Sequence, residues 1–142
     1  MSKSIFIKII IFITAMFLVV YLVSKKEPQN IEVLEEMPNI EIEILKEGEG
    51  DFSKKGDTLV VDYVGTFENG EEFDASREDP FEFVLGNHSV IEGWEQGMLE
   101  MQVGEIRRIF IPYTLAYGER GSPPIIPEKA NLIFEVELLE IK

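Results

Sequence analysis

The sequence contains no cysteine and only one histidine, His88. Without cysteine the chain forms no disulfide and has no thiol nucleophile or cysteine-based metal site. A single histidine excludes a histidine-cluster zinc site and makes acid–base chemistry by imidazole a poor prospect. The sequence also lacks a G-x-S-x-G motif and a phosphate-binding glycine loop. We therefore predict neither a metal nor a cofactor.

Basic residues are scarce in most of the chain. Residues 1–26 hold four lysines and no acidic residue, so the rest of the chain has nine basic and 27 acidic residues, a net charge of −18. Nucleic acid and anionic lipid both repel a surface of this sign. We therefore expect no nucleic acid among the partners, and we interpret the acidity mainly as a contribution to solubility.

The sequence has one long apolar run, from Ile5 to Val23, interrupted only by Lys8 and Thr14. Its 19 residues approach the roughly 20 that a helix needs to cross the hydrocarbon core of a membrane. A cleaved signal peptide is the alternative, but "VVYLVSKKE" has bulky residues where signal peptidase requires small ones. We therefore predict an uncleaved signal-anchor that leaves the acidic body on the periplasmic or extracytoplasmic side.

The remaining sequence divides into a linker and a domain. Following the membrane segment at residues 1–26, residues 27–39 form an acidic linker, and residues 40–142 form a globular domain. In this domain "IEIEILK" alternates as a half-buried strand does, and "TLVVDYVGTF", "PFEFVLG", "EIRRIFIP" and "NLIFEVELLEIK" also read as strands. Asn69-Gly70 is typical of a hairpin turn. These patterns predict an α+β fold with a mostly antiparallel sheet.

The one helix expected in this domain lies in "VIEGWEQGM", where Ile91, Trp94 and Met98 share a face. Gly93 and Gly97 weaken it, since glycine costs about 0.5–1 kcal/mol in a helix relative to alanine. We expect the two glycines to let the sheet approach closely. By residue type alone, Trp94 is more often core than binding site.

Several segments together follow a known order and spacing. They are "VDYVG", "EFDAS", "PFEFVLG", "VIEGWEQGM", "GEIRRIFIP", "LAYGERG", and "IIP" followed by "NLIFEVELLEI". Over roughly residues 40–142 the chain resembles the FKBP-type peptidyl-prolyl cis-trans isomerases. The resemblance implies a curved antiparallel sheet of five to six strands wrapped around one short helix. It also implies a hydrophobic pocket for prolyl peptides and for macrolides such as rapamycin.

The resemblance also assigns roles to individual residues. Catalytic roles fall to Asp74, Tyr117 and Phe134. The residues implied in substrate binding are Tyr63, Phe73, Phe81, Val90, Ile91, Trp94 and Ile126. In the expected mechanism an apolar pocket eases rotation of the prolyl bond without a covalent step, and Asp74 acts electrostatically together with the Tyr117 hydroxyl. From spacing alone, Asp74 also fits a turn cap. The alternative function is an FKBP-like module or chaperone that binds a proline-containing partner with little catalysis.

Overall fold

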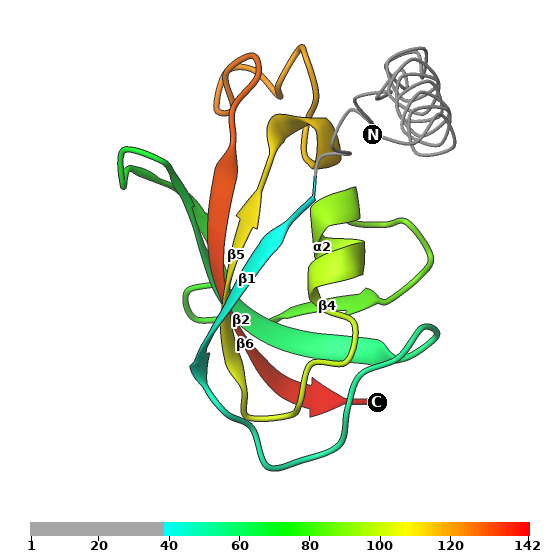
Figure 1. The fold of residues 1–142 in the computed structure, drawn as a ribbon. Coiled ribbons are helices and arrows are strands. Elements are labelled where there is room, and N and C mark those ends of the chain that lie inside the picture. The colour runs from blue at the N-terminus through cyan, green and yellow to red at the C-terminus, as the bar shows by residue number, and fades with distance from the viewer. Residues whose placement is uncertain (1–38) are drawn as a thin grey trace, which may run out of the picture. The chain divides into compact units, whose positions relative to one another are not determined.

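An antiparallel sheet of six strands and one short α-helix form the regular framework of residues 39–142, the part of the chain described by the computed structural model (Figure 1). The elements are β1 (Glu41–Lys46), β2 (Thr58–Phe67), β3 (Glu72–Ala75), β4 (Phe81–Val84), α2 (Glu92–Gly97), β5 (Ile106–Ile111), the 3-10 helix η1 (Tyr113–Leu115) and β6 (Leu132–Ile141). This architecture confirms the predicted antiparallel sheet and its single short helix within the described residues.

The strand order of the sheet is β1-β5-β6-β2-β3, and β4 also pairs with β2. β3 pairs with the C-terminal part of β2, at residues 64–66, whereas β4 pairs with the N-terminal part, at residues 58–61. The chain therefore leaves the sheet after β3 and rejoins it at β4, which pairs with the same neighbour, β2. Asp74 in β3 and Phe81 in β4 consequently flank a gap in the pairing along β2.

The predicted Asn69-Gly70 turn joins β2 to β3. Gly70 has a φ of 86°, and its N–H donates to the Phe67 carbonyl at 2.9 Å. Glycine adopts this left-handed backbone without the steric penalty that a Cβ imposes. The turn sets the register in which Gly65 faces Asp74 across the two strands.

The hydrophobic core lies between α2 and the face of the sheet that α2 covers (Figure 1). Strand alternation decides which side chains reach it. In β5, Arg107, Ile109 and Ile111 are buried, whereas the residues between them are only partly buried. In β4, Phe83 is 5% exposed, but Phe81 on the same face remains 39% exposed because it borders the cavity described below.

The prediction of a half-buried strand at "IEIEILK" is wrong in one respect. The strand exists as β1, but all six of its residues are exposed, including Ile42 and Ile44 at 44% and 48%. β1 lies at one edge of the sheet, and among the described strands it pairs only with β5. Alternation in the sequence gave the strand correctly, whereas burial depends on the position that the strand takes in the sheet.

Gly93 and Gly97 bring α2 against β5, as predicted. A Cβ on Gly93 would lie 2.3 Å from Cγ2 of Ile111, and a Cβ on Gly97 would lie 2.8 Å from Cδ1 of Ile109. Both distances are well below ordinary van der Waals contact. Packing against β5 therefore requires glycine at both positions, although glycine is a weak helix former. Tertiary contacts rather than helix propensity hold this short helix in place.

Replacing Gly93 with alanine is expected to destabilise the fold. Helix propensity alone would favour the variant by about 0.5–1 kcal/mol. Overpacking against Ile111 costs about 1–3 kcal/mol, so the free energy of unfolding measured in urea should fall. Glu92→Ala, at an exposed position of the same helix, is the control and should change stability little. A Gly93→Ala protein more stable than the wild type would contradict the packing account.

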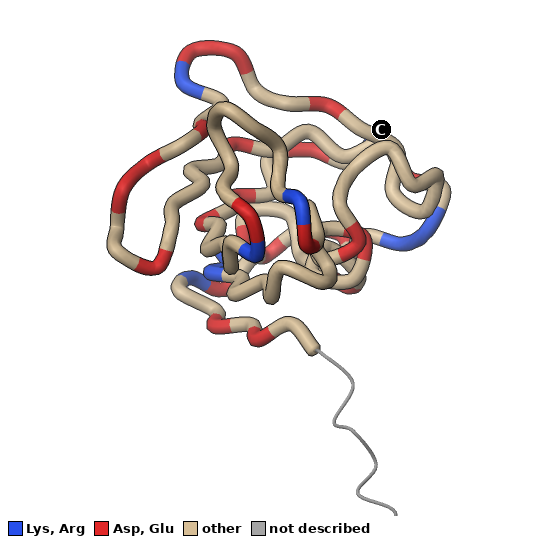
Figure 2. The backbone as a smooth tube through the Cα atoms, turned by 90° about the horizontal axis from the view of Figure 1, so that it is seen from above, with Lys and Arg blue, Asp and Glu red and all other residues tan. Residues whose placement is uncertain are grey.

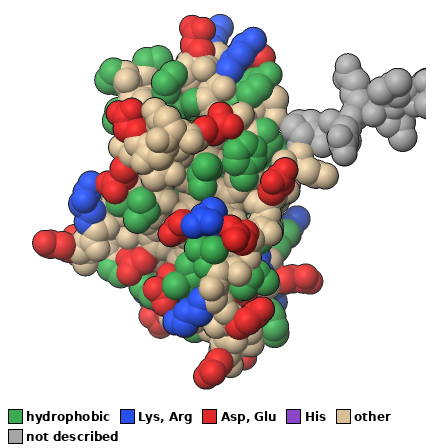
Figure 3. Space-filling model, turned by 60° about the vertical axis from the view of Figure 1, so that its left-hand side comes forward, with side chains coloured by type: hydrophobic (Ala, Val, Ile, Leu, Met, Phe, Trp, Pro, Cys, Tyr) green, Lys and Arg blue, Asp and Glu red, His purple; other side chains and the backbone are tan. Residues whose placement is uncertain are grey.

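Acidic residues are spread over the described part of the chain. Figure 2 shows them along much of the backbone tube, and Figure 3 shows them distributed over one face among exposed hydrophobic side chains. Arg108 is one of the few basic residues between them, and it bridges Glu43 on β1 and Glu135 on β6. The acidic residues are thus not confined to one element of the described part of the chain.

The predicted membrane segment at residues 5–23 lies outside the described residues, as does the linker up to residue 38. Within residues 39–142, no helix is long and apolar enough to span a membrane.

Candidate active site

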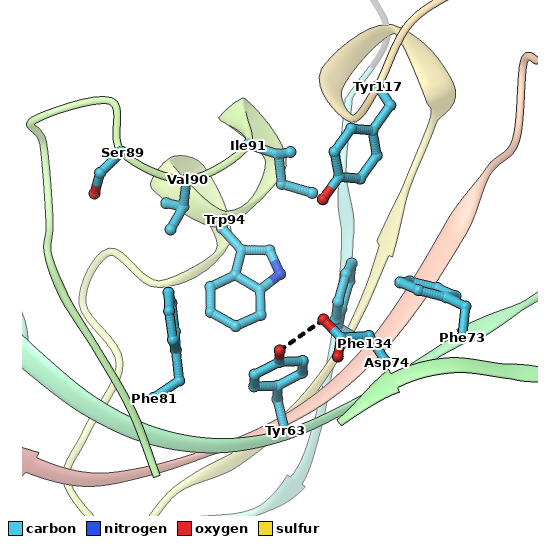
Figure 4. A pocket seen from close by; sticks show the side chains of 10 residues that line it. All are labelled: Tyr63, Phe73, Asp74, Phe81, Ser89, Val90, Ile91, Trp94, Tyr117 and Phe134. Carbon is cyan, nitrogen blue, oxygen red and sulfur yellow. Dashed lines mark hydrogen bonds between the residues drawn. The ribbon is translucent and has the colours of Figure 1, made fainter. Parts of the chain in front are cut away.

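A cavity of about 390 Å³ opens beside α2, and most of its lining is aromatic (Figure 4). We call it the aromatic cavity. Its lining residues are Tyr63, Phe73, Asp74, Phe81, Ser89, Val90, Ile91, Trp94, Tyr117 and Phe134. The structure thus brings together nine of the ten site residues predicted from the sequence.

Four of the strands, the helix α2 and two loops contribute to this lining. Tyr63 comes from β2, Phe134 from β6, and Trp94 from α2. β3 and β4 supply the residues on either side of their gap, and the loops before α2 and after η1 close the rim. The cavity therefore forms only when β2, β3, β4 and β6 are assembled beside the helix.

Trp94 forms the floor of the aromatic cavity and is 4% exposed. Its ring centroid lies 5.1 Å from that of Tyr63 and 5.3 Å from that of Phe134, and both ring pairs are nearly perpendicular, at 86°. Phe81 also meets Trp94 edge-on, at 6.0 Å. Edge-to-face pairs of this kind are favoured by the ring quadrupoles, so the rings hold one another in fixed orientations.

The indole nitrogen of Trp94 is buried without a hydrogen-bond partner in the described part of the chain. Leaving a buried donor unsatisfied costs about 1–3 kcal/mol. An aliphatic side chain would fill the space without this cost. Trp94 therefore serves the cavity at some expense of stability, as is common for residues at functional sites.

Asp74 is the only charged side chain in the lining. Its Oδ2 accepts a hydrogen bond from the Tyr63 hydroxyl at 2.7 Å, drawn as the dashed line in Figure 4, and its Oδ1 accepts one from the Ala75 N–H at 2.9 Å. These two bonds fix the orientation of the carboxylate. The sequence analysis predicts Tyr63 as a substrate-binding residue and pairs Asp74 with Tyr117, so it does not predict the hydrogen bond between Tyr63 and Asp74. Only the register that pairs Gly65 with Asp74, set by the turn, shows that Tyr63 lies within reach.

Other hydrogen-bond donors of the aromatic cavity also have no partner within residues 39–142. Among them are the Tyr117 hydroxyl, on a side chain that is 43% exposed, and the backbone N–H of Ile91. Figure 4 shows the Tyr117 hydroxyl pointing into the cavity, beside Ile91. Both donors are therefore available to a carbonyl oxygen of a bound ligand.

The environment of the two cavity tyrosines keeps them protonated. Burial raises the pKa of Tyr63 above the usual tyrosine value of 10.0, and its hydrogen bond to Asp74 raises this pKa further. Burial also raises the pKa of Tyr117, with an added contribution from the charge of Asp74. Both hydroxyls consequently remain donors throughout the neutral range.

We expect these tyrosines to make the site insensitive to mildly alkaline pH. Because folding raises the pKa of Tyr63, its contribution to stability is complete below about pH 10 and is lost as pH rises through the folded-state pKa. An ultraviolet absorbance titration should show the Tyr63 step above pH 10, and Tyr63→Phe should remove that late step. Ionisation of Tyr63 at or below the ordinary tyrosine pKa would contradict the raised pKa that we attribute to burial and to the hydrogen bond with Asp74.

Two site residues differ from the prediction. Ile126 does not line the aromatic cavity, because its side chain turns into the core, where it is 5% exposed. Its backbone pairs with that of Ser122 through two hydrogen bonds of 2.9 Å, which close the loop before β6. Ser89 was missed, although it lines the cavity. A lone serine carries no sequence signal that separates it from any other loop serine.

Sequence comparisons identify the family to which this site belongs. A family model described as FKBP-type peptidyl-prolyl cis-trans isomerase matches residues 49–139, a range that holds every residue lining the aromatic cavity. The chain belongs to this family. The resemblance seen in the sequence motifs is thereby confirmed, and the chain is an FKBP that catalyses peptidyl-prolyl cis-trans isomerisation.

Individual FKBP relatives are similar over the same region. Peptidyl-prolyl cis-trans isomerase FKBP1A of Xenopus laevis is 47% identical over 106 residues, covering 72% of this chain and 98% of that relative. FKBP2 of Homo sapiens is 54% identical over 92 residues, covering 63% of this chain and 65% of the relative. FKBP15-2 of Arabidopsis thaliana is 54% identical over 89 residues, covering 61% and 55%. The similarity to the last two thus extends over less than two thirds of their length.

Proposed function

We propose that this FKBP isomerises Xaa-Pro bonds of polypeptides in its aromatic cavity by a non-covalent mechanism. The observation that carries the proposal is the lining itself, which surrounds a single carboxylate with aromatic rings. Catalysis by this FKBP does not need a nucleophile, because rotation about the prolyl bond forms and breaks no covalent bond.

The rotation is slow in water because resonance gives the C–N bond partial double-bond character, with a barrier of about 18–20 kcal/mol. Twisting the bond removes this resonance and makes the carbonyl less polar. An apolar, water-excluding cavity therefore disfavours the planar, charge-separated amide more than the twisted one. This difference amounts to preferential binding of the transition state.

The polar groups of the cavity complement the rings. The proline ring would rest on Trp94, while the Tyr117 hydroxyl and the Ile91 N–H donate to carbonyl oxygens of the peptide. Asp74, oriented by Tyr63, stabilises the redistributed dipoles of the twisted bond and takes no part in proton transfer. Fixed dipoles of this kind are effective because they need no reorganisation during the reaction.

A matched pair of phenylalanine variants tests the site. Phe81 lines the cavity and is 39% exposed, whereas Phe52 is 61% exposed and does not line it. Assayed on a Leu-Pro peptide, Phe81→Ala should lower kcat/KM about tenfold, a loss of about 1.4 kcal/mol in transition-state binding, and Phe52→Ala should leave it unchanged. Equal activity of the two variants would place catalysis elsewhere. Peptide binding without turnover by the wild type would favour a binding module.

We further propose that a macrolide such as rapamycin occupies the aromatic cavity. Two relatives are named FK506-binding proteins, from Rhizopus delemar and Debaryomyces hansenii. Trp94 is the only tryptophan of the chain and lies on the cavity floor, so its fluorescence reports occupancy. Rapamycin should change this emission and inhibit isomerisation with the same concentration dependence. Inhibition without a change in the emission would place the macrolide elsewhere.

For the N-terminal residues we propose a retained membrane anchor at residues 5–23 and a domain on the extracytoplasmic side. The supporting feature is the apolar run without small residues at a cleavage position. Membrane fractionation of the full chain, followed by mass measurement of its N-terminus, provides the test. A soluble product that begins after Ser24 would show cleavage and contradict the anchor.

A further inference from the structure

Glu95 is a buried carboxylate that the proposed mechanism does not use. It follows Trp94 in α2 and is 6% exposed. Its Oε2 accepts a hydrogen bond from the N–H of Gly86 at 2.6 Å, and its Oε1 accepts one from the N–H of His88 at 2.8 Å. Both oxygens are therefore committed to backbone amides of one loop. A buried carboxylate is costly unless such partners satisfy it.

That loop, residues 86–91, is the entrance loop of the cavity. It runs from the end of β4 to α2, and its residues Ser89, Val90 and Ile91 line the aromatic cavity. A shift of this loop would therefore move three of the lining residues together, among them Ile91, whose N–H has no partner within residues 39–142.

The backbone of the entrance loop is not favourable on its own. Gly86 has a φ of 89°, and His88 has a φ of 59°, a left-handed conformation that non-glycine residues rarely adopt. Such a conformation costs about 1–3 kcal/mol and persists only when its surroundings enforce it. The His88 side chain is 77% exposed and lies 3.8 Å from Glu92, so packing of this side chain does not enforce it.

We propose that Glu95 is a positioning residue of the isomerase site, an inference that rests on the proposed function. Its carboxylate ties the entrance loop to the helix that carries the Trp94 floor. Hydrogen bonds to an ionised acceptor are roughly twice as strong as neutral ones. Glu95 thereby sets the spacing between the floor of the cavity and its entrance and holds the strained backbone at His88.

Glu95→Gln is the decisive variant because it keeps the size of the side chain. The new amide group donates rather than accepts, so it opposes one of the two backbone N–H groups. We expect KM to rise about tenfold while kcat stays within about twofold, because the loop contacts the substrate equally in its ground state and transition state. If the glutamine variant does not fold, Glu95→Asp shortens the side chain but keeps the charge, and the same increase in KM is expected.

Glu105→Gln is the matched control. Glu105 is also a buried carboxylate, 3% exposed, but it bonds Arg107 and the N–H of Gln102 and does not touch the aromatic cavity. At a temperature where all variants are folded, Glu105→Gln should leave KM unchanged even though it lowers stability. An equal rise of KM in both variants would reduce Glu95 to a general stabilising role and overturn the proposal.

A measurement independent of activity separates this inference from the proposed function. Amide hydrogen exchange, followed by NMR, should show Gly86 and His88 protected in the wild type and exchanging at least about tenfold faster in Glu95→Gln. The same amides should keep their protection in Glu105→Gln. Unchanged exchange at Gly86 and His88 in Glu95→Gln would overturn the positioning role, whatever the isomerase activity of the chain.

Discussion

Replacing Arg107 with methionine is expected to lower the free energy of unfolding by about 3–5 kcal/mol, the usual effect of breaking a buried ion pair. The Arg107 side chain is 9% exposed, and its guanidinium binds the Glu105 carboxylate. The same group donates to the carbonyls of Gly97, Leu99 and Glu100 at 2.8–2.9 Å. The variant leaves a buried carboxylate without its cation and three carbonyls at the end of α2 without a donor.

Urea denaturation of Arg107→Met and Arg108→Met provides the comparison. Arg108 is the next residue of β5 and also bonds two carboxylates, but its side chain is 43% exposed. Exposed ion pairs contribute little, so Arg108→Met should change stability much less. The double variant Glu105→Met/Arg107→Met should recover part of the loss, because it removes both buried charges. Equal losses of unfolding free energy in Arg107→Met and Arg108→Met would contradict the conclusion that burial makes the Arg107 contacts the more important ones.

Replacing Asp74 with asparagine is expected to lower kcat/KM by about 10–100-fold, because a hydrogen bond to a charged group is worth about 1.5–3 kcal/mol. The variant keeps the shape of the side chain and removes the only charge in the lining of the aromatic cavity. Tyr63→Phe should cause a smaller loss, since it frees the carboxylate to turn but leaves the charge and the ring in place.

Asp62→Asn is the control for Asp74. Asp62 precedes Tyr63 on β2, so strand alternation places it on the opposite face of the sheet, where it accepts a hydrogen bond from Ser76. Its replacement should leave kcat/KM unchanged in the peptide isomerisation assay. If Asp74→Asn keeps kcat/KM within about twofold of the wild type, the carboxylate takes no part in the mechanism.

The local features of the fold could be predicted because each follows from nearby residues. Alternation indicates strands, Asn69-Gly70 indicates a turn, and the two helical glycines indicate close packing on a sheet. The exposure of β1 could not be predicted in this way, because an edge strand and an inner strand share the same alternation. Whether a strand is exposed or buried depends on the strand order, which brings together segments distant in the sequence.

The same distinction between local and long-range features applies to the candidate site. All lining residues except Ser89 were predicted from motifs that keep their spacing, and the aromatic ones among them meet in the structure. The bond between Tyr63 and Asp74 depends on the register of two strands, and the inward turn of Ile126 depends on how its loop closes. Glu95 was missed because its role lies in contacts with backbone amides, which leave no pattern of residue types in the sequence.

The central claim is that the Xaa-Pro amide bond rotates while the proline ring rests on Trp94 inside the aromatic cavity. An exchange NMR experiment on a labelled Leu-Pro peptide with the full chain measures both parts of this claim in one spectrum. We predict cross-peaks between the cis and trans proline signals, together with NOEs from the proline ring to the Trp94 indole. Cis–trans exchange without any NOE to Trp94, or NOEs to Trp94 without exchange, would contradict the account.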